Sequence, residues 1–277
     1  MAPMTQERDP FEGITDEKVS SPAETRLDLL TRARRGFVRI RKDMVQHPHD
    51  PRPSVLADFV AERRERALDL ILSVHALQPM LVDGPLPLSA WARMLDVPGR
   101  PCSTRAIADS LRYLRRKSLL TMSGSKAAPT IELRRENGDG EAWVETGADD
   151  DRGRGYFTVP FEYWTSRTFE TLRLPGKAMF LILLKETQNP AGPLTFTMPV
   201  ERAPEWYGLS ERTAERGYLE LRRAGIMREK VQKVPDASHP AGRREVHHRA
   251  LKPPYSTDSR ERLRLEAAAS RVTKAAP

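Results

Sequence analysis

The sequence has a single cysteine, Cys102, among its 277 residues. No disulfide can form within the chain, and a zinc site built from cysteines is excluded. Long apolar runs are also missing, since the longest, from Ala178 to Leu184, is far too short to span a bilayer. The first ten residues mix polar and charged side chains and lack the pattern of a signal peptide. We therefore expect a cytoplasmic protein with no membrane partner.

Motifs typical of catalysis or cofactor binding are scarce. A phosphate-binding loop around Gly176-Lys177 would need glycine where Thr171 stands and Ser or Thr where Ala178 stands. The segment His47-Pro48-His49 has the spacing of a metal-binding histidine pair, but proline between the histidines argues against the central strand that such pairs occupy. No nucleophile with an adjacent base can be identified. We expect a protein without enzymatic activity, cofactor or metal.

What the sequence does contain is positive charge. Lysine and arginine number 46 against 38 acidic residues, which gives a formal net charge of +8. Such an excess favours a polyanionic partner, with nucleic acid first and an anionic membrane surface second.

Apolar spacing and capping residues predict three helices followed by a hairpin in each half of the chain. In the first half the expected helices are Val55–Leu81, Ser89–Leu95 and one capped by Ser103 or Thr104 that ends near Lys117, and the hairpin strands are Leu119–Ser123 and Thr130–Arg134. In the second half the helices are Pro175–Gln188, Glu201–Tyr207 and Ser210–Ala224, and the hairpin strands are Ile226–Val234 and Glu245–Leu251. Two further strands are expected at Tyr156–Val159 and Leu194–Met198.

Three other segments complete the expected organisation. Residues 23–45 have helical spacing and a basic face, which is either a solvated surface or an arm that contacts the DNA backbone. Residues 137–155 are rich in glycine and acids and are expected to be a linker facing away from DNA. Asp258–Val272 is expected to be a polar helix or a frayed tail.

The sequences of the two halves align at a constant offset of 107 residues, which places Ser103 on Ser210 and Arg105 on Arg212. Leu111 then falls on Tyr218, Leu114 on Leu221, Arg115-Arg116 on Arg222-Arg223, and Leu119 on Ile226. Each copy therefore has a capped helix with an early arginine, apolar positions at helical spacing, a double arginine and a strand. This internal repeat is the strongest signal in the sequence.

Exposed arginines on such helices can donate two hydrogen bonds to guanine in the major groove. Asp109 and Glu215 either accept a hydrogen bond from cytosine or orient an arginine. The first helix has five basic residues and one acid between Thr104 and Lys117, whereas the second has four and three between Glu211 and Arg223, so we expect the second to be more selective. The predicted DNA contacts are Ser103, Thr104, Arg105, Asp109, Arg112, Arg116 and Lys126 in the first half, and Ser210, Glu211, Arg212, Glu215, Arg216, Arg228, Lys230, Arg243 and Arg244 in the second.

The segments Leu88–Ser123 and Phe196–Val234 each resemble winged helix-turn-helix modules, and the pair resembles tandem winged-helix initiators of bacterial plasmids. The stretch from Trp206 to Gly217 also resembles helix-turn-helix segments of actinobacterial regulators. The resemblance implies a mainly α fold with small β-hairpin wings (α+β), divided into a disordered lead (1–22), an N-terminal basic helix and linker (23–54), a first winged-helix domain (55–136), the acidic linker (137–155), a second winged-helix domain (156–254) and a polar, flexible tail (255–277).

The implied function is sequence-specific binding of double-stranded DNA, with a neighbouring site read by the same chain or across a homodimer. The leading interpretation is a transcription regulator. Two alternatives remain open: a replication initiator that binds origin repeats, and an interaction protein whose modules bind other proteins.

Overall fold

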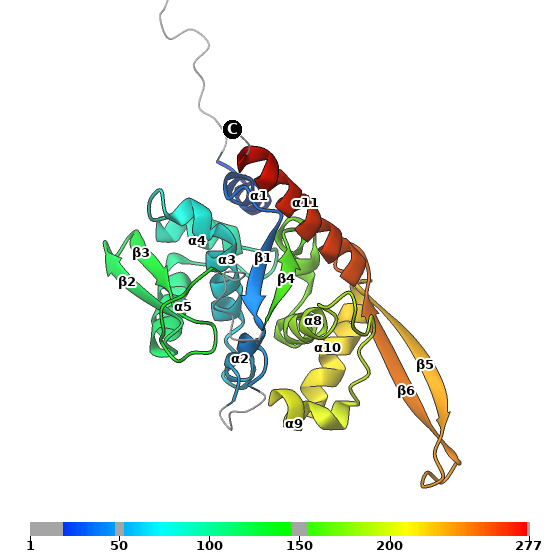
Figure 1. Ribbon diagram of the computed structural model, residues 1–277. Helices are drawn as coiled ribbons and strands as arrows, with labels where there is room; N and C mark the ends of the chain where they lie inside the picture. The colour runs from blue at the N-terminus through cyan, green and yellow to red at the C-terminus, as the bar shows by residue number, and fades with distance from the viewer. Residues whose placement is uncertain (1–18, 48–52, 146–154, 276–277) are drawn as a thin grey trace, which may run out of the picture.

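The computed structural model describes residues 19–47, 53–145 and 155–275, and it shows a mixed α+β fold with three two-stranded antiparallel sheets among these residues (Figure 1). One cluster of buried apolar side chains runs through both halves of the chain, from Leu29 to Tyr255. Most of the expected disordered lead, the residues between His47 and Pro53, and the acidic run Asp149–Asp151 lie outside the described residues.

The first half contains the expected helices and hairpin, but the first expected helix is divided into two helices. Its elements are α2 (Val55–Ala61), α3 (Glu65–Leu81), α4 (Leu88–Leu95), α5 (Thr104–Arg116), β2 (Leu120–Gly124) and β3 (Pro129–Leu133). The single helix expected over Val55–Leu81 is wrong, because Arg63 has a left-handed backbone with a φ of 54°. The Arg63 amide donates to the Val60 carbonyl at 3.1 Å and the Arg64 amide donates to Phe59 at 2.8 Å, which ends α2 in a Schellman motif.

The second half follows the same order. Its elements are β4 (Tyr156–Pro160), α6 (Glu162–Thr165), α7 (Thr168–Thr171), α8 (Leu174–Glu186), the 3-10 helix η2 (Val200–Arg202), α9 (Ala203–Tyr207), α10 (Glu211–Arg223), β5 (Met227–Pro235) and β6 (Arg243–Leu251). The strand expected over Leu194–Met198 is reduced to one bridge, in which Phe196 pairs with Arg249 of β6. In Figure 1 the β5–β6 hairpin projects well beyond the body of the molecule.

The N-terminal segment departs most from expectation. Instead of one basic helix over 23–45, it forms α1 (Pro22–Arg32), β1 (Phe37–Arg41) and the 3-10 helix η1 (Lys42–Met44). Val38 and Ile40 are almost fully buried and alternate with the partly buried Phe37 and Arg39 in β1, which pairs antiparallel with β4. Arg41, predicted on an exposed face, is instead buried and donates to the Glu136 carboxylate at 2.8 Å. The charges of this segment therefore do not form a continuous helical face for DNA.

The described part of the expected acidic linker is folded back on the first half. Arg134 bridges to Ala142, and the Arg135 amide donates to the Glu141 carbonyl at 2.9 Å. Asn137 accepts a hydrogen bond from the Asp139 amide within the turn between them. Residues 137–145 therefore belong to the packed structure, whereas 146–154 lie outside the described residues.

Of the two alternatives for the C-terminal segment, the structure shows the helix and not the frayed tail. The segment forms α11 (Thr257–Ala275), which packs beside β4. Arg260 at its start is 1% exposed and donates to the carbonyl oxygens of Leu184 at 2.9 Å and Thr187 at 2.7 Å. These carbonyls lie at the C-terminal end of α8, where the helix dipole favours a positive charge. Burial lowers the pKa of Arg260 to about 10, yet the guanidinium keeps its hydrogen bonds to the end of α8.

The offset of 107 residues is present in the structure as well as in the sequence. It places α5 on α10 residue by residue, and it places the first residue of β2 on the first residue of β5. Ser118 and Gly225 also correspond, and both have left-handed backbones, with φ values of 56° and 71°. Both helices end in a Schellman motif, in which Leu119 donates to Leu114 and Ile226 donates to Leu221 at 3.0 Å each.

A buried ion cluster joins the two halves. Lys177 of α8 is 1% exposed and lies 2.6 Å from a carboxylate oxygen of Asp69 in α3. Glu65, also in α3, contacts Lys177 at 3.2 Å, Arg173 at 3.3 Å, and Arg100. Burial opposes ionisation of Glu65, but the surrounding cations outweigh it and hold its pKa below the usual value. Because these groups come from α3, α8 and the loop before α5, they fix the two halves relative to each other.

We expect Lys177→Met to lower the free energy of unfolding by about 3–5 kcal/mol, because Asp69 would remain buried without its partner. Urea denaturation followed by circular dichroism measures this loss. Adding Asp69→Leu to Lys177→Met should recover part of it. Lys126→Met removes an exposed lysine and serves as the control, with an expected change within about 0.5 kcal/mol. A similar small effect at Lys177 would contradict the structural role of the cluster.

Ser118 and Gly225 occupy equivalent positions, so exchanging serine and glycine at each should change stability in opposite directions. Ser118→Gly should raise the free energy of unfolding by about 0.5–1 kcal/mol, because glycine adopts the left-handed backbone without the strain of a Cβ atom. Gly225→Ser should lower it by about 1 kcal/mol for the same reason. Thermal and urea unfolding of the two variants measure both changes, and effects of the same sign would refute the equivalence of the two helix ends.

Candidate nucleic-acid interface

Helix α5 separates a buried face from a basic one. The Ser103 hydroxyl accepts a hydrogen bond from the Ala106 amide at 3.2 Å, which resolves the cap in favour of Ser103 over Thr104. Ile107, Leu111 and Leu114 are almost fully buried against the preceding helices. The exposed face carries Thr104, Arg105, Asp109, Arg112 and Arg116.

Helix α10 repeats this arrangement. The Ser210 hydroxyl accepts from the Thr213 amide at 3.2 Å, while Tyr218 and Leu221 are buried. At Gly217 the helix crosses α8 so closely that a Cβ atom would lie 2.3 Å from the Met179 Cγ atom. Glycine at this position is what allows the two helices to approach. The exposed face carries Glu211, Arg212, Glu215 and Arg216.

Several charges of these helices are engaged within the protein. Asp109 pairs with Arg112 one turn along α5, which favours the orienting role for Asp109. Lys117 lies 2.7 Å from both Asp58 and Glu62, so its charge is neutralised locally. Glu220 turns away from the exposed face of α10 and accepts from the amides of Arg173 at 3.0 Å and Gly176 at 3.1 Å. The difference in charge between the two helices is therefore smaller at the surface than in the sequence.

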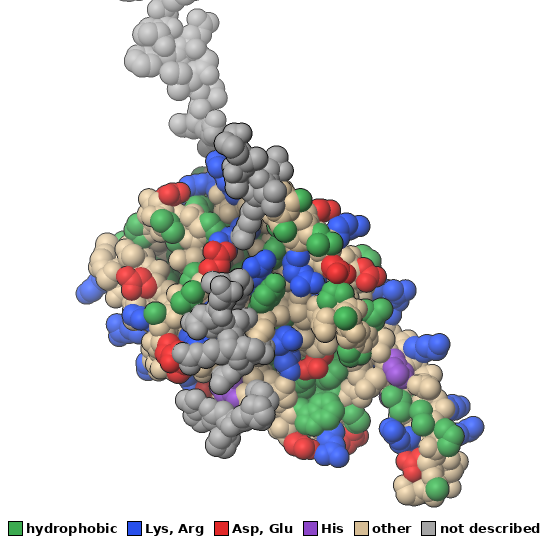
Figure 2. Space-filling model, viewed as in Figure 1, with side chains coloured by type: hydrophobic (Ala, Val, Ile, Leu, Met, Phe, Trp, Pro, Cys, Tyr) green, Lys and Arg blue, Asp and Glu red, His purple; other side chains and the backbone are tan. Residues whose placement is uncertain are grey.

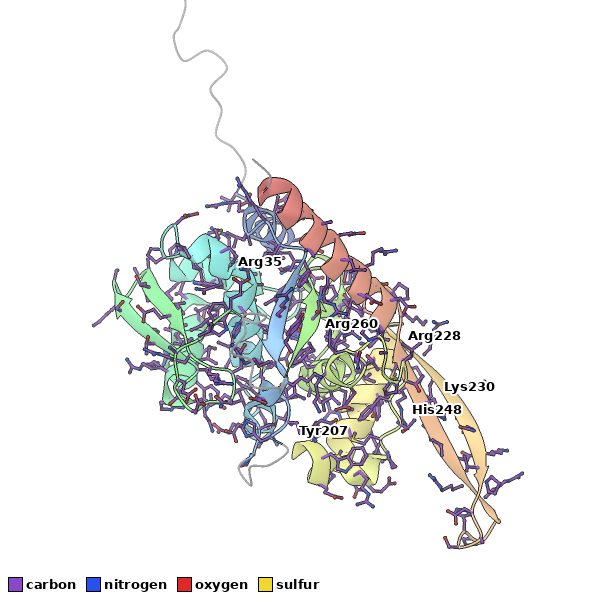
Figure 3. The ribbon with its side chains drawn as sticks, viewed as in Figure 1. Arg35, Tyr207, Arg228, Lys230, His248 and Arg260 are labelled. Carbon is purple, nitrogen blue, oxygen red and sulfur yellow. The ribbon has the colours of Figure 1, made fainter. Side chains whose placement is uncertain are left out.

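The two hairpins differ strongly in charge. The β2–β3 hairpin carries one lysine, Lys126 near its turn, and one acid, Glu132. The β5–β6 hairpin is longer and carries basic side chains along the length that projects from the body (Figure 2). Strand alternation places Arg228, Lys230, Arg244 and His248 on one face of it, and Figure 3 shows Arg228, Lys230 and His248 on this hairpin.

The structure exposes every residue that the sequence predicts to contact DNA. Two of the basic ones have acidic partners, Arg112 with Asp109 and Arg244 with Asp236 at 3.7 Å. The others have no ion pair among the described residues: Arg105, Arg116, Lys126, Arg212, Arg216, Arg228, Lys230 and Arg243. They do not converge on one point but lie on α5, on α10 and along the hairpins.

No protein-family model, curated protein or solved structure matches this chain. Within the described ranges, no helix is both long and apolar enough to cross a lipid bilayer. The same residues include no group of three or more histidine, cysteine or acidic side chains placed to hold a metal ion.

One carboxylate anchors the base of the β5–β6 hairpin. Glu229 contacts Arg249 at 3.0 Å, His247 at 3.0 Å and Arg222 of α10 at 3.3 Å. Arg249 is buried and lies 3.9 Å over the ring of Tyr218, which also belongs to α10. Burial raises the pKa of Tyr218 to about 12, although the charge of Arg249 opposes this. The hairpin is thus held against α10 by interactions that the sequence pattern did not reveal.

We expect Glu229→Gln to loosen the base of the hairpin, because Arg249 would lose the ionised partner of its buried guanidinium. The loss should amount to about 1–3 kcal/mol of local stability. Amide hydrogen exchange in β5 and β6 measures it as faster exchange. Glu245→Gln is the matched control, since it removes an exposed acid from the same hairpin that has no ion pair among the described residues. Equal exchange rates in the two variants would contradict the anchoring role of Glu229.

Proposed function

We propose that this protein binds double-stranded DNA in a sequence-specific manner through two winged helix-turn-helix modules. The first module comprises α3, α4, α5 and the β2–β3 hairpin, and the second comprises α8, α9, α10 and the β5–β6 hairpin. Helices α5 and α10 are the proposed recognition helices, and the hairpins are the wings that lie on the backbone beside each groove.

The observation that carries the proposal is the repeated unit itself. A serine cap, an arginine two residues after it, a basic exposed face and a Schellman end recur on α5 and α10 at one fixed offset. A helix that presents its N-terminal turn to a groove needs a satisfied cap and exposed donors close to it. Both are present twice in the same chain.

The distribution of charge supports DNA over a protein partner. The exposed arginines of α10 and the basic face of β5–β6 include several with no acidic partner among the described residues. Unpaired arginines can replace the counterions that surround DNA phosphates, and release of those counterions drives binding.

The experiment is selection of a binding site from random duplexes, followed by titration of the selected and a random duplex at several salt concentrations. Affinity should fall steeply with salt, and the ratio between the two duplexes should persist. Arg105→Ala and Arg212→Ala should each weaken binding to the selected duplex by about 1–3 kcal/mol and relax the preference for one base. The double variant Arg228→Ala/Lys230→Ala should weaken binding to both duplexes equally.

Arg262→Ala removes an exposed arginine of α11 and is the matched control, with no expected effect on either duplex. The absence of binding to any duplex at low salt would overturn the proposal and favour a protein partner. The form of the selected site distinguishes the biological roles, because an inverted repeat at a promoter fits a regulator and an array of direct repeats fits a replication initiator.

A further inference from the structure

A basic cleft of about 600 Å³ lies between the two halves of the molecule. It is bounded by the junction of α2 and α3, the loop before α5, one face of α5 and the start of α8. Six basic residues line it: Arg63, Arg64, Arg66, Arg100, Arg173 and Lys177. The acids that line it are Glu65, Asp69 and Asp109.

The acids of the cleft are already engaged. Asp69 and Glu65 bind Lys177, Arg100 and Arg173 in the buried cluster, and Asp109 pairs with Arg112. The remaining cations are the three arginines at the junction of α2 and α3. Arg64 lies 5.0 Å over the ring of Tyr113, and Arg66 donates to the Pro101 carbonyl. None of these three arginines has an acidic partner among the described residues, so the cleft has net positive charge at its rim.

Arg63 supplies an independent observation. It occupies the position after the C-cap of α2, where the left-handed backbone favours glycine. Holding an arginine there costs about 1–2 kcal/mol of backbone strain. The Schellman hydrogen bonds of the Arg63 and Arg64 amides offset part of this cost within the chain. The Arg63 side chain itself is exposed and forms no ion pair within the described part of the chain, so its charge is available at the rim of the cleft.

The cleft also borders α5 directly and is connected to α10 through Arg173. Ala106, Asp109 and Tyr113 of α5 line one side of it, next to the exposed face that carries Arg105 and Arg112. On the other side, the Arg173 amide donates to Glu220 of α10 at 3.0 Å. DNA that contacts both helices would therefore pass its backbone across this cleft.

We propose that the cleft binds a phosphate of the DNA backbone between the two recognition helices, with Arg63 as its principal contact and Arg64 beside it. This inference rests on the proposed function. Arginine suits the role because its planar guanidinium can donate two hydrogen bonds to one phosphate. The contact fixes the position of the duplex but reads no base.

The test is Arg63→Gly, because this variant removes the charge and relieves the backbone strain at the same time. The free energy of unfolding should not fall, whereas affinity for selected and random duplexes should fall by the same factor. The slope of log affinity against log salt should become shallower by about 0.9, the value expected for one lost phosphate contact. Arg63→Lys keeps the charge and should restore most of the affinity and the slope.

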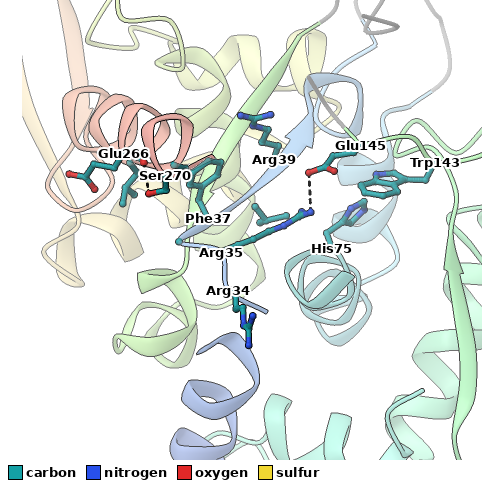
Figure 4. Close-up of a pocket in the computed structure, with 13 residues that line it drawn as sticks. Arg34, Arg35, Phe37, Arg39, His75, Trp143, Glu145, Glu266 and Ser270 are labelled. Atoms are coloured by element: carbon teal, nitrogen blue, oxygen red, sulfur yellow. Dashed lines mark hydrogen bonds and ion pairs between the residues drawn. The ribbon is translucent and has the colours of Figure 1, made fainter. Parts of the chain in front are cut away.

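Arg34→Gly is the matched control. Arg34 also follows the C-cap of a helix, α1, has a φ of 51°, and is exposed. It lines a different cavity, of about 340 Å³ between β1 and α11, which shares no lining residue with the cleft (Figure 4). Arg34→Gly therefore makes the same change of charge and backbone elsewhere, and it should leave affinity and salt slope unchanged.

The outcomes separate this inference from the proposed function. If the wild-type protein binds no duplex, the proposed function fails and the inference fails with it. If the wild-type protein binds and Arg63→Gly behaves like Arg34→Gly, the phosphate site is overturned while DNA binding stands. A selective loss of affinity in Arg63→Gly for one duplex alone would also overturn it, because a phosphate contact acts on every sequence.

Discussion

The buried pair between Lys177 and Asp69 is the interaction on which the arrangement of the two halves depends. Charges this deeply buried are costly unless they are paired and hydrogen-bonded, so the structure must keep α8 against α3 to satisfy them. Glu65 extends the pair to Arg100 and Arg173, and Glu220 of α10 binds the amide of Arg173. Through this sequence of contacts the position of α10 is coupled to the position of α5. The two proposed recognition helices are therefore held in a fixed position relative to each other.

The N-terminal and C-terminal segments both pack against the second half of the molecule. Strand β1 pairs with β4, which brings the N-terminal segment against the second half, and Arg41 is secured by Glu136 from the region after β3. Arg260 of α11 binds the C-terminal carbonyls of α8, the helix that also carries Lys177. Helix α8 is therefore held at one end by Arg260, near its start by Asp69, and along its length by α10, where Gly217 permits close packing. The segments that looked peripheral in the sequence are part of the support for α10.

Two groups of basic side chains in the molecule have different roles. Lys177, Arg41, Arg249 and Arg260 are buried and bind carboxylates or carbonyls, so they stabilise the fold. Arg63, Arg105, Arg212, Arg216, Arg228 and Lys230 are exposed and have no ion pair among the described residues. The net charge of +8 alone does not distinguish these groups. Only the second group is available for a polyanion, and it lies on α5, on α10, on the basic hairpin and at the cleft between the halves.

The sequence by itself determined the features that depend on neighbouring residues. The cap at Ser210, a cap at Ser103 or Thr104, the amphipathic helices that follow them, both hairpins and the fixed offset between the halves were predicted. Hydrogen bonds and apolar spacing within a few residues specify these features. The tertiary structure alone decided that residues 37–41 form a strand, since β1 exists only by pairing with β4 more than a hundred residues away. It likewise decided the break at Arg63 and the burial of Arg41, Lys177 and Arg260. In a sequence, a charged side chain is expected to lie at the surface. Its burial becomes favourable only when the tertiary structure places hydrogen-bonding or oppositely charged partners around it.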